Sequence, residues 1–203
     1  MESNLRPAET NVLYRFSELK WLDRSLRLGE FRLVSASYIN GIEGDTERQD
    51  NEIDRNFDVD SSRAKIIHAS TGKEIPLKSS INVSCSTDTD YYMLCFSTQK
   101  SKINYDLFMG SEGYIAIQDR SEFTRRLNHA VAEVLPNWQT LNAGIAYGMK
   151  QHEYGALFRK PNEYIFQFEW RYVWLPPNKE QNLENFVVSV GNLEDISYVQ
   201  EKG

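Results

Sequence analysis

The longest strand-like run in the chain, residues 164–174 (YIFQFEWRYVW), constrains its fold most. Aromatic residues fill much of this run, and such residues favour a pleated, half-buried surface. Two prolines at 176 and 177 stop the run, since proline does not continue a central strand. Alternation places Gln167 and Glu169 on one face, while the aromatic residue between them faces the core. The run therefore predicts a long strand in an aromatic-rich sheet.

Shorter runs of the same character are spread along the rest of the chain. They cover residues 11–16, 31–35, 63–68, 81–85, 91–98, 113–118 and 186–190. In contrast, the segment 38–60 is densely charged and has little apolar periodicity. This pattern predicts a solvated loop there.

Two segments have helical spacing instead. The first has Ser17 as its expected N-cap and Gly29 as the glycine expected just past its end. The second is capped by Asp119 or Ser121, and Pro136 ends it. Because strands and helices do not alternate strictly, we expect the α+β class, with mixed or antiparallel sheets and two main helices.

The chain's 203 residues fit one ordinary domain, so we expect residues 1–10 to be a flexible N-terminus and residues 11–203 to form a single domain. The net charge of −6 argues against a broad electrostatic nucleic-acid binder, although not against an enzyme that contacts a few nucleotides in a cleft. No signal-peptide or membrane-spanning pattern is present, which predicts a cytoplasmic location without a membrane partner. Cys85 and Cys95 lack metal-ligand spacing and are expected to be reduced core thiols.

Polar side chains accompany three of the predicted strands. These are Arg15 in the first strand, Ser97 and Thr98 at the end of the run 91–98, and Gln167 with Glu169 in the longest run. An unpaired buried carboxylate is costly, so Glu169 needs a reason for its position. A structural ion pair with Arg15 or Arg171 is one explanation.

In this order the residues resemble the Arg, Ser-Thr, Gln-x-Glu pattern of the ADP-ribosyltransferase superfamily. In that superfamily the arginine comes from the first strand, the Ser/Thr from a middle strand and the glutamate from a late strand. A wider resemblance is to the bacterial domain family described as DUF2971, through LYRF, GEFRLVSASYIN, CFS, GYIAI and FQFEWRYVW. Where that family often continues with ND(P)xE, this chain has YINGIE. The resemblance implies an ADP-ribosyltransferase-like fold for residues 11–203.

The resemblance also implies that NAD is a substrate, cleaved between nicotinamide and ribose. Breaking this bond develops oxocarbenium-like charge, which a fixed carboxylate stabilises. Glu169 would supply that carboxylate, and Gln167 would face the acceptor of ADP-ribose. The acceptor is a macromolecule (RNA, DNA or protein), and no metal is required.

Further residues would bind NAD on the same resemblance. Arg15 would hold a phosphate or ribose, because its planar guanidinium offers several donors. Ser97 and Thr98 would orient the glutamate and frame the nicotinamide with hydroxyls that donate and accept. Tyr105 and Phe108 would stack on the nicotinamide.

Two other classes of function compete with this interpretation. A catalytically silent binding or regulatory domain on the same fold would explain the charged residues through a strand salt bridge. A metal-dependent nuclease would use the acidic residues Glu43, Asp45, Glu47, Asp50 and Glu52, although their spacing is irregular. If the chain is a transferase that modifies its own cell, it would act as the toxin of a toxin–antitoxin or phage-defence system, with an antitoxin protein as partner.

Overall fold

The computed structural model describes residues 11–41, 54–63, 65–101, 110–148 and 152–202. Its helices and strands, in chain order, are β1 (Leu13–Ser17), α1 (Leu19–Arg27), β2 (Glu30–Ser35), α2 (Ala36–Asn40), β3 (Asp54–Val59), η1 (Ser61–Arg63), β4 (Ile66–Ile67), β5 (Glu74–Ile75), β6 (Ile81–Ser86), β7 (Tyr92–Ser97), β8 (Gly113–Ile117), α4 (Arg120–Val134), β9 (Gln139–Gly144), β10 (Ala146–Tyr147), η2 (Gly155–Phe158), β11 (Arg159–Lys160), η3 (Asn162–Gln167), β12 (Glu169–Leu175), β13 (Phe186–Ser189) and β14 (Ser197–Glu201). In this described part of the chain, no helix is both long and apolar enough to cross a bilayer.

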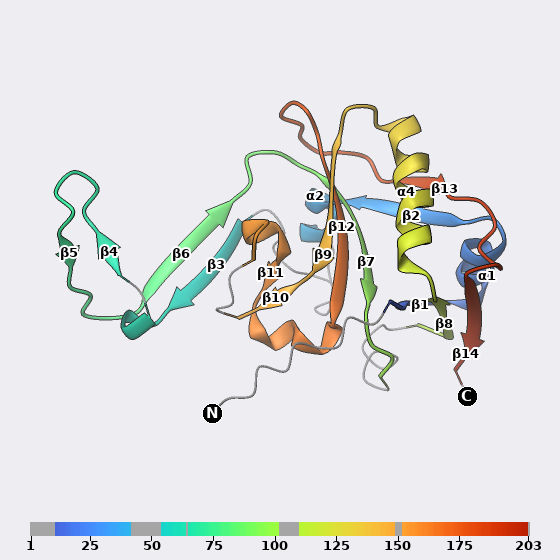
Figure 1. The fold of residues 1–203 in the computed structure, drawn as a ribbon, viewed down its shortest axis with the longest axis horizontal. Coiled ribbons are helices and arrows are strands. Elements are labelled where there is room, and N and C mark those ends of the chain that lie inside the picture. The colour runs from blue at the N-terminus through green and yellow to red at the C-terminus, as the bar shows by residue number, and fades with distance from the viewer. Residues whose placement is uncertain (1–10, 42–53, 64, 102–109, 149–151, 203) are drawn as a thin grey trace.

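An eight-stranded sheet forms the body of the molecule (Figure 1). Its strand order is β13-β2-β7-β1-β8-β14, and β12 pairs with both β7 and β9. The strand pairs in this sheet are antiparallel. The α+β class and the antiparallel sheet predicted from the sequence are therefore confirmed.

The two faces of the sheet are covered by different elements. On one face, Phe123 and Leu127 of α4 pack in the same cluster as Leu94 and Phe96 of β7. The opposite face forms a second cluster, in which Met93 of β7 lies with side chains that include the η2 aromatic residue. Because side chains alternate along a strand, Cys95 and Ser97 lie on this second face with Met93.

The central strand β7 lies at a fork in the sheet. One edge of β7 pairs with β12 over its whole length, from Tyr92 to Ser97. Its other edge pairs with β2 at Tyr92 and Met93, and with β1 at Ser97. Between these two paired regions, strands β1 and β2 diverge from each other, so this edge of β7 is open beside residues 94–96.

The helix ends confirm one expected cap and correct another. Asp119, rather than Ser121, caps α4 by accepting a hydrogen bond from the Glu122 backbone N–H at 3.0 Å. Ser17 does not cap α1, because it is the last residue of β1 and Glu18 occupies the cap position. The Glu112 carboxylate accepts from the first helical N–H instead, at 2.8 Å.

Gly29 follows α1 as expected from the sequence. Its φ is +64°, and a Cβ at this position would lie 2.0 Å from the Gly191 carbonyl oxygen. Only glycine fits both the left-handed backbone and this close approach. The turn lets β2 run back directly from α1 into the sheet.

The charged segment 38–60 was wrongly expected to be a loop throughout. Residues up to Asn40 belong to α2, where the Ser35 hydroxyl accepts a hydrogen bond from the Tyr38 backbone N–H. Residues 54–59 form β3 and pair with β6. Backbone and capping hydrogen bonds hold both elements. Such bonds do not require regularly spaced apolar residues, so the sequence shows no apolar period there.

Candidate functional site

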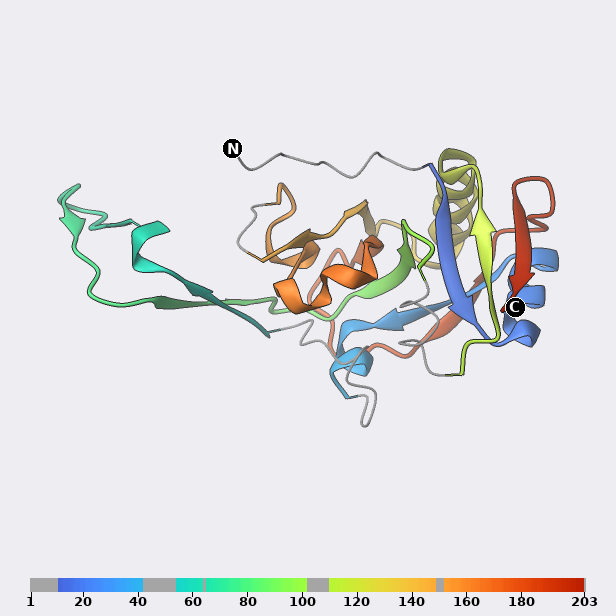
Figure 2. The same cartoon turned by 90° about the horizontal axis from the view of Figure 1, so that it is seen from below.

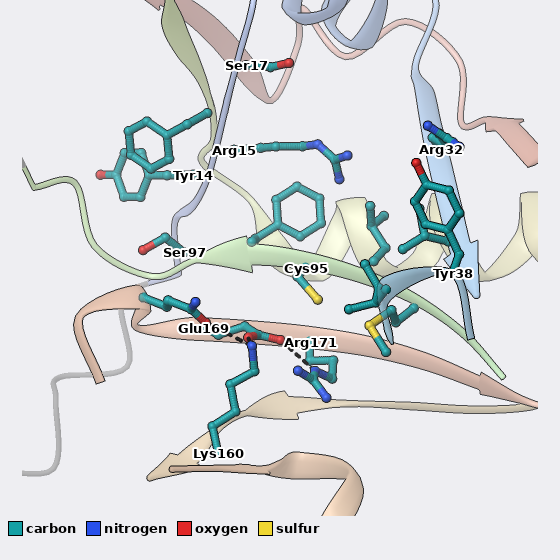
Figure 3. A pocket seen from close by; sticks show the side chains of 17 residues that line it. Tyr14, Arg15, Ser17, Arg32, Tyr38, Cys95, Ser97, Lys160, Glu169 and Arg171 are labelled. Atoms are coloured by element: carbon teal, nitrogen blue, oxygen red, sulfur yellow. Dashed lines mark hydrogen bonds and ion pairs between the residues drawn. The ribbon is translucent and has the colours of Figure 1, made fainter. Parts of the chain in front are cut away.

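A cavity of about 310 Å³ lies at the fork beside β7 (Figure 3). It is lined by Tyr14, Arg15, Phe16, Ser17, Arg32, Val34, Tyr38, Ile39, Met93, Leu94, Cys95, Phe96, Ser97, Lys160, Gln167, Glu169 and Arg171. Strands β1, β2, β7 and β12 all contribute, together with α2, β11 and the end of η3. Four residues proposed from the sequence, Arg15, Ser97, Gln167 and Glu169, therefore meet in one cavity.

A buried ion cluster forms one wall of this cavity. Glu169 Oε1 accepts from Arg171 Nε at 2.6 Å, and Lys160 Nζ lies 3.0 Å from Glu169 Oε2. The Glu169 and Lys160 side chains are about 5% exposed, and that of Arg171 is fully buried. The guanidinium also donates to the Leu157 carbonyl oxygen at 2.9 Å. The ion pair expected between Arg171 and Glu169 is present, and Lys160 is a second partner that the sequence did not suggest.

Glu169 is ionised at neutral pH in this setting. Burial alone would raise the pKa of its carboxyl group, but the neighbouring Arg171 and Lys160 cations outweigh burial and hold the pKa well below its usual value. The Tyr147 hydroxyl accepts a hydrogen bond from the Glu169 backbone N–H at 2.8 Å. The two cations thus keep the carboxylate ionised, and the hydrogen bond of the Glu169 backbone holds the residue in position.

The long strand predicted for residues 164–174 is wrong in its first half. Residues 162–167 form η3 after Pro161, and Phe168 has a left-handed φ of 44°. The strand β12 begins only at Glu169. Gln167 and Glu169 therefore do not share a strand face, but Lys160 Nζ joins them by donating to Gln167 Oε1 at 3.0 Å.

Ser97 and Thr98 contribute differently from what the resemblance implied. Ser97 lines the cavity and lies opposite Glu169 in the strand register, while its hydroxyl donates to the Gln99 carbonyl oxygen at 2.8 Å. Thr98 is not among the described residues that line the cavity. Its backbone N–H and its hydroxyl both donate to the Phe168 carbonyl oxygen, at 2.8 and 2.9 Å. Thr98 therefore fixes the turn that leads into Glu169.

The other wall carries two further arginines. The Arg15 guanidinium lies 5.9 Å from the centre of the Phe96 ring, and the Arg32 guanidinium lies 4.9 Å from that of Tyr38 (Figure 3). The Tyr38 side chain is 43% exposed, so its ring borders the open side of the cavity. The sequence placed Tyr38 in a loop and gave Arg32 no role in the site, although both lie in the stretch GEFRLVSASYIN that carries the wider family resemblance.

The cavity is strongly cationic although the chain is acidic. Its lining includes four basic side chains, Arg15, Arg32, Lys160 and Arg171, and one acidic side chain, Glu169. This gives the lining a formal charge of +3, against −6 for the whole chain. Positive charge on the walls of a low-dielectric cavity attracts an anion. The site is therefore suited to a phosphate-bearing ligand.

Cys95 lines the cavity and also packs against the second core cluster, as expected for a core thiol. It is a free thiol and faces Arg171 across the β7–β12 pair. Burial raises the pKa of the thiol, and the Glu169 charge raises it further. Cys95 is therefore protonated at neutral pH and a poor nucleophile.

Some of the proposed residues lie outside the described part of the chain. These are Tyr105, Phe108 and the acidic set Glu43, Asp45, Glu47, Asp50 and Glu52. Within the described ranges, no group of three or more His, Cys, Asp or Glu residues is arranged to hold a metal ion.

The ion cluster predicts a loss of stability in acid. The pKa of Glu169 is about 4.5 in the unfolded chain and lower in the folded protein, so below that pH the unfolded state binds more protons. The free energy of unfolding should fall as pH drops from 4.5 toward the folded value. Urea unfolding at a series of pH values checks this. A Glu169→Gln variant should show a shallower fall than Glu163→Gln, which makes the same change at an exposed position, and equal falls would contradict the assignment.

Searches against protein-family models, curated proteins and solved structures found no significant match to this chain. The function is therefore inferred from the chemistry of the site itself.

Proposed function

We propose that this chain is an NAD-dependent mono-ADP-ribosyltransferase with an ADP-ribosyltransferase-like fold. The observation that carries the proposal is the meeting of Arg15, Ser97 and Glu169 in one cationic cavity. They come from β1, from the end of β7 and from the start of β12, and β7 pairs with both of the other strands. This order and strand placement support the resemblance to the superfamily pattern.

The cationic lining supports binding of the NAD diphosphate. Arg15 and Arg32 lie on the wall opposite the ion cluster and would contact the phosphates through their planar donor groups. A volume of about 310 Å³ is at the small end of ligand pockets. It would hold the reacting half of the dinucleotide, while the remainder extends past the exposed ring of Tyr38.

Glu169 would act as an anion and not as a proton donor. Cleavage breaks the bond between ribose C1′ and the nicotinamide nitrogen, and nicotinamide leaves with the electron pair. The ribose then carries oxocarbenium-like positive charge until an acceptor oxygen or nitrogen bonds to C1′ and loses its proton. A carboxylate that is already ionised and held in place stabilises this charge without reorganising. Gln167, tied through its Oε1 to Lys160, would orient the acceptor.

The two ion pairs of Glu169 favour a second candidate function. Both carboxylate oxygens already contact a cation, which is sufficient to explain why a glutamate is buried here. The same cavity would then belong to an anion-binding domain without catalytic activity. Such a domain would bind NAD or another nucleotide but would release no nicotinamide.

Incubation of the purified protein with labelled NAD and cell extract tests the proposal. Release of nicotinamide and transfer of label into a protein or nucleic-acid fraction are expected from the wild type. Saturable NAD binding without nicotinamide release would support the silent binding domain. Neither binding nor release by a folded protein would reject both candidates.

Replacing Arg15 with lysine should weaken NAD binding. Lysine keeps the charge but loses the planar, multi-donor contact with a phosphate, and a charge-assisted hydrogen bond contributes about 1.5–3 kcal/mol. We therefore expect the KM for NAD to rise about tenfold or more, with a smaller change in kcat. Steady-state nicotinamide release measures both constants. Arg27→Lys, on the exposed face of α1 with 64% of its side chain accessible, is the matched control and should change neither. An unchanged KM in Arg15→Lys would remove Arg15 from the binding site.

A further inference from the structure

A two-stranded arm projects from the body of the protein (Figures 1 and 2). Its stem is the antiparallel pair β3–β6, in which six residues on each strand are in register. Six residues span about 20 Å at the rise of a β-strand. Beyond the stem, β4 and β5 form a second short pair that closes with a turn at Gly72. The tip of the arm therefore lies well away from the sheet.

The tip displays apolar side chains to solvent. Ile66, Ile67 and Ile75 are 38%, 62% and 44% exposed. An isolated two-stranded ribbon is at best marginally stable in water, because it buries little apolar surface. An arm of this kind gains stability when it binds a partner along its length or at its tip.

The charge of the tip identifies the kind of partner. Residues 65–80 contain three lysines, Lys65, Lys73 and Lys78, and one acidic residue, Glu74. All four side chains are exposed, and Glu74 pairs only weakly with Lys65, at 3.5 Å. The tip is thus basic in a chain whose net charge is −6. The negative net charge of the whole chain, which argued against nucleic-acid binding, conceals this local excess of basic side chains.

We propose that residues 65–80 bind duplex DNA. A two-stranded ribbon fits the major groove of B-form DNA, lysines at its edges contact phosphates, and isoleucine contacts thymine methyl groups. Single strands are a poorer match, because binding sites for them stack bases on aromatic rings and residues 65–80 include no Phe, Tyr or Trp. Duplex RNA is also a poorer match, since its major groove is deep and narrow.

The arm is continuous with the candidate site. Strand β6 leads through residues 87–91 into β7, and the Glu180 backbone N–H donates to the Thr89 hydroxyl at 3.0 Å, which fixes the base of the arm to the body. A duplex bound at the tip would be tethered through the arm to the body that carries the candidate site. Resting on the proposed function, this placement makes duplex DNA the macromolecular acceptor of ADP-ribose.

Fluorescence anisotropy with a labelled 20-base-pair duplex tests the binding site. The tip variant is Lys65→Glu/Lys73→Glu/Lys78→Glu, and the control is Lys20→Glu/Arg125→Glu/Lys202→Glu, which makes the same change of charge at exposed positions on the body. We expect the tip variant to lose at least tenfold in affinity and the control less than threefold. The slope of log affinity against log salt should become shallower by about 2–3 in the tip variant, because each lost phosphate contact contributes about 0.9.

Several results would overturn the inference. These are no duplex binding by the wild type at low salt, equal losses in the two variants, or tighter binding of single-stranded DNA or duplex RNA. The wild type could instead form a dimer in light scattering that is absent in the tip variant, and bind no DNA. That result would identify a second copy of the chain as the partner of the tip. Circular dichroism confirms that both variants are folded.

Nicotinamide release without DNA separates this inference from the proposed function. The tip variant should release nicotinamide at the wild-type rate but transfer less label to the duplex. Tip-dependent DNA binding without any nicotinamide release would reject the transferase and support the arm. If nicotinamide is released but DNA binding does not depend on the tip, the proposed DNA-binding role of the arm is rejected and the transferase is retained.

Discussion

Replacing Glu169 with glutamine should reduce nicotinamide release by about 10²–10³-fold, the usual effect of removing one group that stabilises transition-state charge. Glutamine has nearly the same shape but carries no charge to stabilise an oxocarbenium-like ribose. The KM for NAD should change much less than kcat, because the interaction strengthens only in the transition state. Steady-state kinetics at saturating and limiting NAD separates the two constants.

The same substitution should also destabilise the protein. It leaves Lys160 and Arg171 buried beside a neutral amide, and removing one partner of a buried ion pair costs about 3–5 kcal/mol. Domains have about 5–15 kcal/mol of stability, so the variant should remain folded at 20 °C. Activity is therefore compared at that temperature, after thermal unfolding has been followed by circular dichroism.

Glu163→Gln is the matched control for this experiment. It makes the same chemical change on the exposed side of η3, six residues away, and should alter neither activity nor stability. If Glu169→Gln is folded and keeps its activity, the glutamate is structural. Another group of the cavity would then have to stabilise the charge on the ribose, and the proposed role of Glu169 would be rejected.

The local sequence signals predicted the elements that hold the site better than the site itself. Strands β1, β2, β7 and β8 and helix α4 were expected near their actual positions, because each has its own apolar period or cap. The start of β12 was misplaced because aromatic residues continue through η3, and only the left-handed Phe168 separates helix from strand. Side-chain alternation cannot detect such a change of backbone.

The ion cluster shows why the rest of the site was not predicted. Lys160 stands before a proline in a segment with turn character, and nothing local distinguishes it from a surface lysine. It reaches Glu169 only because the folded chain brings the side chain of this β11 residue to the start of β12. Arg171 was one of the two partners expected for Glu169, the other being Arg15, and two residues of one strand that are two apart share a face. Contacts within an element were thus predictable, whereas contacts between distant elements were not.

The arm was missed for a different reason. A two-stranded ribbon that projects from the sheet needs no apolar alternation, so the charged segment before residue 60 had the composition of a loop. Its strand pairing depends on the register between β3 and β6, more than twenty residues apart. Composition averaged over the chain also concealed the basic tip.

Replacing Arg171 with methionine should lower the free energy of unfolding by about 3–5 kcal/mol. Methionine fills similar space but cannot donate hydrogen bonds to the Glu169 carboxylate and to the Leu157 carbonyl oxygen, which the guanidinium holds at 2.6 and 2.9 Å. One buried carboxylate oxygen and one backbone carbonyl then lose a strong donor. Urea unfolding measures the change, and the melting temperature should fall by about 10 °C or more.

Arg125→Met provides the contrast that makes this result interpretable. Arg125 also pairs with a glutamate, at 2.7 Å, but 68% of its side chain is exposed. Solvent screens such a pair, so its loss should cost less than about 1 kcal/mol. Similar losses in both variants would mean that burial does not strengthen the Arg171 contact. Glu169 would then not be fixed in the orientation that the proposed chemistry requires, because Lys160 alone would determine where its carboxylate lies.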